Sequence, residues 1–472
     1  MIKVYVSNIR CRITGDIKEA NKLRNELSFR HPNAWFLRQH MPKGWDGKVQ
    51  WITGNATFKN GLLPQILVKC KDLNIEVELV DDRHLLEFTG IPKKLGDFEP
   101  RGYQKDAINS LVSNELQEGL PWNIGVINAA TNAGKTLIAA AIHKSYKKPK
   151  TLLLLKSVDL FNQAKREYSE LLPDEDIGFI QGSKNNHWGD FTVAMVQTLS
   201  RNINQFRNKL EMVDIVIVDE ADEGTSKQYK TVLNKLYNTT VRVGLSGSIY
   251  LSKLKKHQLK NFELRSFFSD EIFVISKKEM VKKGFSSNLV IKISKVDSGV
   301  KLAGDYKEEY DRNIVFNGDR NNKIVERVRF NLNRGRLPIL IVCRYHNHVN
   351  EVLNYIGNAF GADYAIDSVH HKTPDREKII EAFRKGQIDI LISSLIIKRG
   401  QNLPLIKCLI NAAGGDSEEN VIQIMGRAER KHESKNKTIL EDFFDEGYYL
   451  KRHSKHRIIY YKKQGFKVIQ LY

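Results

Sequence analysis

The chain has 472 residues, of which 41% are hydrophobic and 28% are charged, and its formal net charge is +20. This length suits about two to four domains, and the composition is that of a globular protein rather than a disordered or fibrous one. The basic balance favours a polyanionic partner, most simply nucleic acid, the alternative being that the charge only aids solubility.

The four cysteines lie far apart and show no zinc-binding spacing, so we expect reduced thiols in a cytosolic protein. The first residues contain no signal-peptide hydrophobic region, and no apolar run approaches the roughly 18 residues that a membrane span needs. The expected location is the cytoplasm, or the host cell's cytoplasm if the chain is phage-encoded, with no membrane partner.

Residues 1–95 are predicted to form a small α+β domain at the N-terminus. Apolar residues alternate as in a strand at 1–9 and recur with helical spacing at 17–27. The run at 43–52 contains an Asp-Gly pair and predicts a β-hairpin.

Trp45 and Lys48 lie in this expected hairpin, and Lys and Arg outnumber acidic residues in the domain. A tryptophan beside lysines suits base stacking and phosphate contact, so residues 1–95 are a candidate DNA-binding domain. Packing of the tryptophan in a small core is the alternative.

Glycines and prolines at 90–100 indicate a domain boundary. From 96 to 265 apolar strands alternate with helices, which predicts a parallel sheet covered on both faces. Helices are expected at 101–118, 158–171 and from about 197 to 210. Strands are expected at 124–127, 151–155, 191–196, 213–218 and 240–245.

The stretch from Ala129 to Thr136 reads A-x4-G-K-T and stands between an apolar strand and a helix-like run. This context predicts a phosphate-binding loop, whose backbone N–H groups and helix N-terminus form an anion cradle for ATP. The alternative is an ordinary strand–helix turn, since the usual first glycine is Ala129. The expected ATP contacts are Thr131, Asn132, Ala133, Gly134, Lys135 and Thr136. Within this set, Lys135 meets the terminal phosphates and the Thr136 hydroxyl meets Mg²⁺.

Asp219 and Glu220 end an apolar strand about 80 residues after this loop. A carboxylate at this place holds Mg²⁺, and an adjacent glutamate polarises the attacking water. The two features together predict an ATPase.

The strand–helix rhythm resumes in a second domain, predicted over 266–445, which has no Gly-Lys-Thr loop of its own. Residues 446–472 form a basic, aromatic tail, for which nucleic-acid contact and a solvated docking helix are both open. Strands are expected at 337–343, 364–369, 388–393 and 406–412. Helices are expected at 348–360, 374–384 and 418–431.

Gln423, Arg427 and Arg430 share one face of the expected helix at 418–431. Two arginines presented by one domain to a nucleotide on another can stabilise the charge that develops on a transferred phosphoryl group. We therefore count all three as candidate catalytic residues beside Lys135 and Glu220.

The ordered set of motifs, ending in Q-x-x-G-R-x-x-R, resembles that of superfamily 2 helicases over residues 98–445. The resemblance implies two RecA-like parallel-sheet domains in tandem, here with a small α+β N-terminal domain. It implies that Gln104 reads adenine with Arg101 nearby, and that Ser246 and Ser248 couple the ATP state to domain closure. Gly400 and Asn402, in the motif R-G-Q-N-L-P, join the ATP-binding set. Residues at positions where family members touch the nucleic-acid backbone are Lys156, Thr198, Arg344 and Ser394.

Asp219–Asp222 spells D-E-A-D, but the neighbouring motifs are not those of DEAD-box RNA helicases. The loop reads T-N-A-G-K-T and the third motif S-G-S. With the W-D-G-K stretch and the sequence Y-Q-K-D-A, nearly the whole chain resembles phage branch-migration helicases of the UvsW type.

The leading hypothesis is an ATP-dependent DNA helicase or translocase that remodels branched DNA, such as forks and Holliday junctions, in recombination, replication and repair. Three alternatives stay open: an RNA or RNA–DNA-hybrid helicase, an ATP-switched nucleic-acid binding module, and a restriction-type motor subunit.

Overall fold

The computed structural model describes residues 1–41, 45–130, 133–182, 186–247, 258–285, 288–296, 305–395, 406–416, 437–463 and 466–472. The chain divides into two compact units, Met1–Ile275 and Ser276–Tyr472. Among the described residues, no helix combines the length and apolar character needed to reach across a bilayer.

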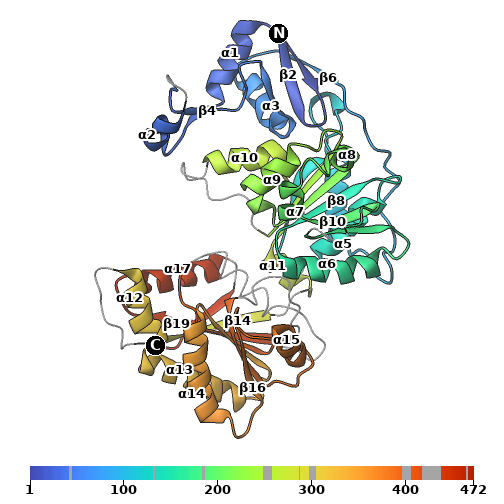
Figure 1. Ribbon diagram of the computed structural model, residues 1–472. Helices are drawn as coiled ribbons and strands as arrows, with labels where there is room; N and C mark the ends of the chain where they lie inside the picture. Colours follow the sequence, from blue (N-terminus) through green and yellow to red (C-terminus); the bar gives the residue numbers. More distant parts are fainter. Residues whose placement is uncertain are drawn as a thin grey trace. The chain divides into compact units, whose positions relative to one another are not determined.

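The first unit begins with a four-stranded sheet in the order β5-β2-β1-β6 (Figure 1). Ile2, Val4 and Val6 of β1 are buried and alternate with half-buried residues, as a strand with one covered face requires. The elements of this part are β1 (Ile2–Val6), β2 (Arg10–Gly15), α1 (Ile17–Glu26), β5 (Thr57–Lys59), α3 (Leu63–Asp72) and β6 (Val77–Asp81).

The hairpin expected at 43–52 is wrong. The stretch contributes one strand, β4 (Lys48–Gln50), which pairs antiparallel with the distant β3 (Ser28–Arg30). The Asp46 carboxylate accepts the Lys48 N–H at 2.9 Å and Gly47 has a φ of 83°, so the Asp-Gly pair turns the chain into β4 rather than joining two strands. A short helix, α2 (Ala34–Leu37), lies between β3 and β4.

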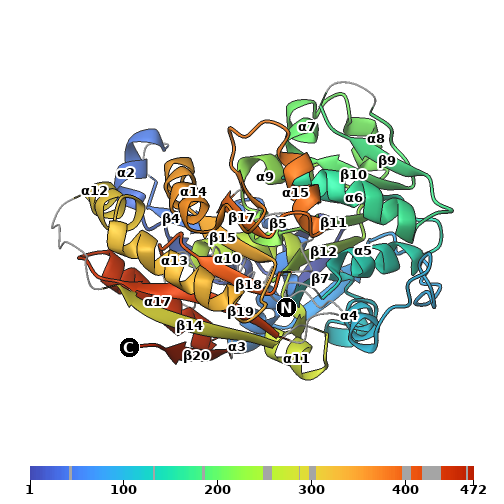
Figure 2. The same cartoon turned by 90° about the horizontal axis from the view of Figure 1, so that it is seen from below.

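A seven-stranded parallel sheet fills the rest of the first unit, in the order β13-β7-β12-β11-β8-β10-β9. Its central strands are almost wholly buried, because helices cover both faces (Figure 2). The strands are β7 (Ile124–Ala129), β8 (Thr151–Leu155), β9 (Ile177–Ile180), β10 (Phe191–Met195), β11 (Ile215–Asp219), β12 (Val241–Ser246) and β13 (Glu271–Ile275).

The helices of this sheet follow the predicted pattern with two differences. The first ends at Val112 rather than near 118, and the helix expected to reach 210 is two short ones separated by a turn. The helices are α4 (Gly102–Val112), α5 (Lys135–Lys144), α6 (Val158–Leu171), α7 (Val196–Arg201), α8 (Arg207–Glu211), α9 (Lys227–Leu233) and α10 (Gln258–Phe268).

The second unit is another seven-stranded parallel sheet, in the order β16-β17-β15-β18-β19-β14-β20. Its strands are β14 (Asn288–Val296), β15 (Ile339–Cys343), β16 (Ile366–Val369), β17 (Ile390–Ser394), β18 (Cys408–Asn411), β19 (Lys437–Asp445) and β20 (Lys467–Gln470). Its helices are α11 (Lys277–Lys282), α12 (Tyr306–Tyr310), α13 (Gly318–Leu332), α14 (His346–Phe360), α15 (Arg376–Arg384) and α17 (Leu450–Lys463).

Two apolar cores lie on opposite faces of this sheet. One gathers Ile324 and Val328 of α13 with Val349 of α14. The other gathers Phe383 of α15 with Tyr461 of α17. The C-terminal residues thus belong to the second sheet: α17 packs on it, and β20 pairs in parallel with β14.

The predicted fold class is confirmed: two RecA-like parallel-sheet domains stand in tandem behind a small N-terminal region of mixed α and β structure.

Candidate nucleotide site

The phosphate-binding loop joins the end of β7 to the start of α5, as its sequence requires. Gly134 is the N-cap residue of α5 and has a φ of 73°, a left-handed conformation that glycine adopts without strain. Ala129, at the position of the usual first glycine, is the buried last residue of β7 and has an ordinary negative φ. Alanine is therefore compatible with the loop.

Gln104 lies under this loop and is only 3% exposed. Its Oε1 accepts the backbone N–H of Arg101 at 2.8 Å, and its Nε2 donates to the carbonyl oxygen of Ala133 at 2.9 Å. A Cβ on Gly134 would lie 2.4 Å from this Nε2, so a larger residue at 134 would displace the Gln104 amide from its place under the loop. The predicted nucleotide residues Gln104, Ala133 and Gly134 are thus brought into direct contact.

Tyr103 is a member of this cluster that the sequence reasoning missed. Its hydroxyl donates to the same Ala133 carbonyl at 3.0 Å and receives a hydrogen bond from Nη1 of Arg101 at 3.3 Å. The available signal was its place between Arg101 and Gln104 at the start of α4.

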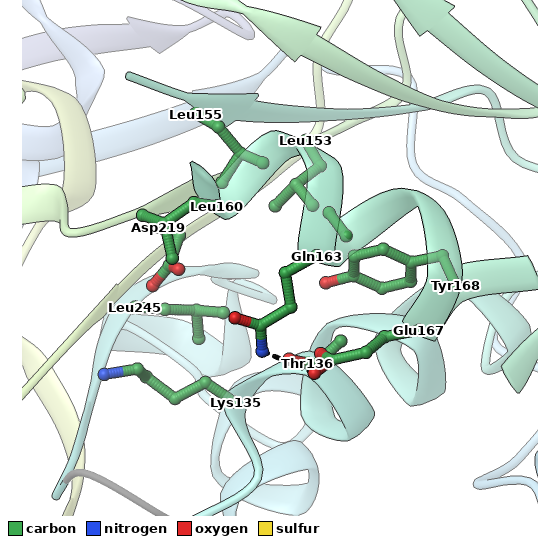
Figure 3. A pocket seen from close by; sticks show the side chains of 11 residues that line it. Lys135, Thr136, Leu153, Leu155, Leu160, Gln163, Glu167, Tyr168, Asp219 and Leu245 are labelled. Carbon is green, nitrogen blue, oxygen red and sulfur yellow. Dashed lines mark hydrogen bonds between the residues drawn. The ribbon is translucent and has the colours of Figure 1, made fainter. Parts of the chain in front are cut away.

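A pocket of about 40 Å³ opens beside the start of α5 (Figure 3). Lys135 and Thr136 line it from α5, and Asp219 lines it from the end of β11. Figure 3 shows Lys135 and Asp219 on one side and Glu167 and Tyr168, both from α6, on the other.

Tyr168 and Gln163 line the pocket but were not predicted as site residues. Gln163 donates to Glu167 one helical turn further along α6. Burial, and then the charges of Asp219 and Glu167, raise the pKa of the Tyr168 phenol well above its usual value. The phenol therefore stays neutral beside the carboxylates.

The sheet order explains why residues far apart in sequence meet here. β7, β12 and β11 are neighbours, and their carboxyl ends place the phosphate loop, Ser246 and Asp219 along one edge. Ligands of open parallel sheets bind at this edge. The Ser246 hydroxyl donates to Asp222 at 3.2 Å, which joins the third motif to the acidic one.

Asp219 and Glu220 adopt a special backbone conformation. Glu220 has φ 54° and ψ 50°, in the left-handed region that non-glycine residues rarely occupy, and its N–H donates to Asp219 Oδ1 at 3.0 Å. Strain of this kind, of order 1–3 kcal/mol, concentrates at functional sites.

The hydroxyl of Thr136 and the carboxylate of Asp219 suit a Mg²⁺ ion, which prefers oxygen ligands and keeps several waters. Among the described residues, no group of three or more His, Cys, Asp or Glu side chains could hold a metal alone. A magnesium ion here would need phosphate and water oxygens as further ligands.

The candidate backbone contacts differ in accessibility. Lys156 is half-buried and paired with Glu223, and Thr198 is 8% exposed and accepts the Gly182 N–H. Arg344 is half-buried and donates to the Tyr306 hydroxyl at 2.7 Å.

Ser394, the last of these candidates, is buried at the end of β17. In the N-terminal part, Lys48 is exposed, whereas Trp45 is half-buried and donates from Nε1 to the Lys48 carbonyl oxygen at 2.8 Å. Trp45 therefore holds the turn before β4.

Eight predicted site residues lie outside the described part of the chain. They are Thr131, Asn132, Ser248, Gly400, Asn402, Gln423, Arg427 and Arg430.

Comparison with known proteins identifies two family models in the chain. Residues 97–250 match the model described as type III restriction enzyme, res subunit, and residues 321–432 match the helicase conserved C-terminal domain. Together these stretches cover more than half of the 472 residues.

The chain is 23% identical to the ATP-dependent DNA helicase uvsW of Enterobacteria phage T4, over 94% of this chain and 90% of that protein. It is 25% identical to IRC3 of Saccharomyces cerevisiae over 73% of this chain, but spans only 51% of that protein.

Among solved structures, the type ISP restriction-modification enzyme LlaBIII bound to DNA aligns with a TM-score of 0.57 at 12% identity, covering 86% of this chain and 34% of that one. This likeness concerns the fold. The two matched models, the paired RecA-like sheets and the nearly full-length similarity to the phage protein lead to one conclusion: this chain belongs to the ATP-hydrolysing, nucleic-acid-binding helicases of superfamily 2 and is similar to those of the UvsW type.

Proposed function

We propose that this protein is a DNA translocase that uses ATP hydrolysis to remodel branched DNA, such as forks and four-way junctions, in recombination, replication and repair. The observation that carries the proposal is the similarity to a DNA helicase over 94% of the chain, which includes the N-terminal region as well as both motor domains.

The attachment of the N-terminal region to the first motor domain supports a mechanical role for it. Arg242 of β12 is 3% exposed and donates to the backbone oxygen of Asn8 and to Asn60 Oδ1. Asn8 in turn donates from Nδ2 to the carbonyl oxygen of Asn238 at 2.8 Å.

The backbone at Gly61 lies directly against α10, since a Cβ there would be 2.4 Å from the Arg265 carbonyl oxygen. With Trp122 and Ile124 in the core of the N-terminal region, these contacts join it to the motor domain in one compact unit. We propose residues 1–95 as a DNA-binding domain and two motor domains after it, the first reaching Ile275, since β13 pairs with β7, and the second reaching the C-terminal strand β20, which pairs with β14. These limits differ from the boundaries at 265 and 445 that the sequence predicts.

Each residue of the nucleotide site has a proposed task. Lys135 would neutralise the terminal phosphates, while Thr136 and Asp219 would hold Mg²⁺. Bound magnesium would neutralise phosphate charge. Glu220 would take a proton from the attacking water, since its carboxylate follows the magnesium ligand directly.

Three residues outside the described part of the chain complete the proposal from the sequence alone. Gln423 would lie near the γ-phosphate, and Arg427 and Arg430 would stabilise its developing charge. Because the protein would hold DNA through its backbone phosphates, DNA binding would show weak sequence preference and steep salt dependence.

The test compares ATP-driven unwinding of forks, four-way junctions, blunt duplexes and RNA duplexes of matched length. We expect branched DNA to be processed at least about tenfold faster than blunt duplex, and Lys135→Ala to abolish turnover on every substrate. Equal activity on plain duplex would overturn the preference for branches, and ATPase stimulation by RNA alone would replace DNA with RNA as substrate.

A further inference from the structure

Trp35 and Phe36 are the most exposed aromatic side chains in the described part of the chain. Their exposed fractions are 78% and 71%, and their rings meet edge to face with centroids 5.4 Å apart. Two adjoining aromatic rings left in water are costly, and such apolar surface commonly marks a binding site. We define Trp35 and Phe36 as the aromatic tip.

Local packing turns the aromatic tip outward. Only Ala34 of α2 is buried, and its Cβ packs against the backbone of Gly47, where an added Cβ would lie 3.1 Å away. The His31 N–H donates to the Gly47 carbonyl oxygen at 2.8 Å. These contacts hold one side of α2 to the turn before β4 and leave the next two residues facing solvent.

The aromatic tip is carried by a ribbon fixed to the motor domain. α2 projects beyond the ribbon of β3 and β4, as Figures 1 and 2 both show. Phe29 of β3 and Trp51, just after β4, both pack on Phe262 of α10, with ring centroids 4.6 and 5.7 Å apart. Movement of the motor domain would therefore be transmitted to the tip.

The surroundings of the aromatic tip are cationic. Arg30, Arg38 and Lys48 are exposed and form no ion pair with another described residue. From the start of β3 at residue 28 to the end of β4 at residue 50, the sequence holds four Lys and Arg but one acidic residue, Asp46, whose carboxylate accepts the Lys48 N–H. A partner with both anionic groups and flat apolar faces is favoured, which describes nucleic acid.

The geometry of DNA indicates which part of a nucleic acid the aromatic tip can bind. Inside a duplex each base face is covered by its neighbours, so an aromatic ring must first unstack a base step, whereas an unpaired base or the last pair at a branch offers an open face without that cost. We propose that the aromatic tip stacks on the bases exposed at the branch point of DNA and helps to keep the strands apart. This inference rests on the proposed function and names a strand-separating element for it.

The experiment uses the full chain carrying Trp35→Ala with Phe36→Ala, and forked DNA with 2-aminopurine at the branch point. The matched control is Tyr237→Ala, another exposed aromatic residue of the first unit, at 46%. We expect wild type, the control and the conservative Trp35→Phe variant to quench the 2-aminopurine on binding.

For the double alanine variant we expect loss of this quenching and about tenfold slower fork unwinding, with single-strand-stimulated ATPase within twofold of wild type. Quenching and unwinding equal to wild type would overturn the inference. An equal loss of single-strand-stimulated ATPase would also overturn the inference, because it would indicate a general defect. Absence of quenching by wild type would overturn it too, and would assign the tip to a protein partner.

Failure of the proposed function is a separate result. If wild type processes blunt duplex as well as forks, the preference for branches fails, yet the quenching at a duplex end would still report whether the aromatic tip stacks on exposed bases.

Discussion

The side-chain amide of Gln104 donates from Nε2 to the carbonyl oxygen of Ala133 at 2.9 Å, and so ties the start of α4 to the phosphate-binding loop. The same side chain accepts the Arg101 N–H from Oε1. The oxygen and the nitrogen of the amide thus both bind backbone groups, those of Arg101 and Ala133. Recognition of adenine by Gln104 stays a prediction.

Gln104→Ala should weaken ATP binding about tenfold, because loss of a buried hydrogen-bond partner costs about 1–3 kcal/mol. The KM for ATP in DNA-stimulated hydrolysis measures this. Lys105→Ala, an exposed neighbour on α4, is the control and should change little. Equal KM values for the Gln104 variant and wild type would remove Gln104 from the site.

Glu220→Gln should lower ATP turnover by about 10²-fold or more while ATP still binds, since a lost general base typically costs 10²–10⁴ in rate. Phosphate release measures turnover and a fluorescent ATP analogue measures binding. Glu170→Gln, an exposed position on α6, serves as the control. Turnover within a few-fold of wild type would assign the base to another residue.

Arg457→Met should destabilise the second unit by about 3–5 kcal/mol, because Asp442 would be left as a buried, uncompensated charge. Arg457 is 1% exposed, and its Nε donates to Asp442 Oδ2 at 3.0 Å. Tyr461 donates to the same oxygen at 2.6 Å. Urea unfolding followed by circular dichroism gives the change in stability.

The control for this prediction is Arg452→Met, because Arg452 lies five residues earlier on α17, about 1.4 turns, and is exposed. It should change stability by less than about 0.5 kcal/mol. Similar losses for both variants would mean that α17 contributes through general charge rather than through the buried pair.

Glu175→Gln should destabilise the protein at neutral pH, with an effect that shrinks in acid. Contact with His143, at 3.4 Å, and with Lys144, at 2.6 Å, lowers the pKa of Glu175 from 4.5 to about 2. A lowered folded-state pKa adds stability above pH 4.5 that is lost as the pH falls toward 2, because the unfolded chain takes up the proton first.

Urea midpoints of wild type and variant between pH 7 and pH 3 measure this difference. Glu87→Gln, which removes a surface pair with Lys147, is the control and should have a small effect. A gap between wild type and Glu175→Gln that stays constant down to pH 3 would contradict the assignment.

Local patterns predicted much of the fold because they depend on neighbours in sequence. The strand at Thr151–Leu155 and the helix at Val158–Leu171 have the expected bounds, since an all-apolar run and a 3.6-residue period leave little choice. The 43–52 hairpin failed because β4 pairs with a strand some 20 residues earlier, and pairing of that kind leaves no local signal.

For the C-terminal residues, charge and aromatic content left two interpretations open. The structure shows that α17 packs on the second sheet and that one of its basic residues, Arg457, is a buried partner of Asp442, whereas nucleic-acid contact by this segment stays a prediction. The composition of a segment does not tell which of its charges face inward.

The sequence by itself determined the chemistry of this protein: a Gly-Lys-Thr loop after a strand, an Asp-Glu pair ending another, and the order in which they occur. These signals are local, because phosphate and magnesium binding need particular groups on one short stretch. Only the tertiary structure decided that Gln104 holds Ala133, that Ser246 meets Asp222, and that Trp35 and Phe36 rather than Trp45 face solvent. Each of these depends on strand order and on which surfaces are buried, and both are set by packing between residues far apart in the chain.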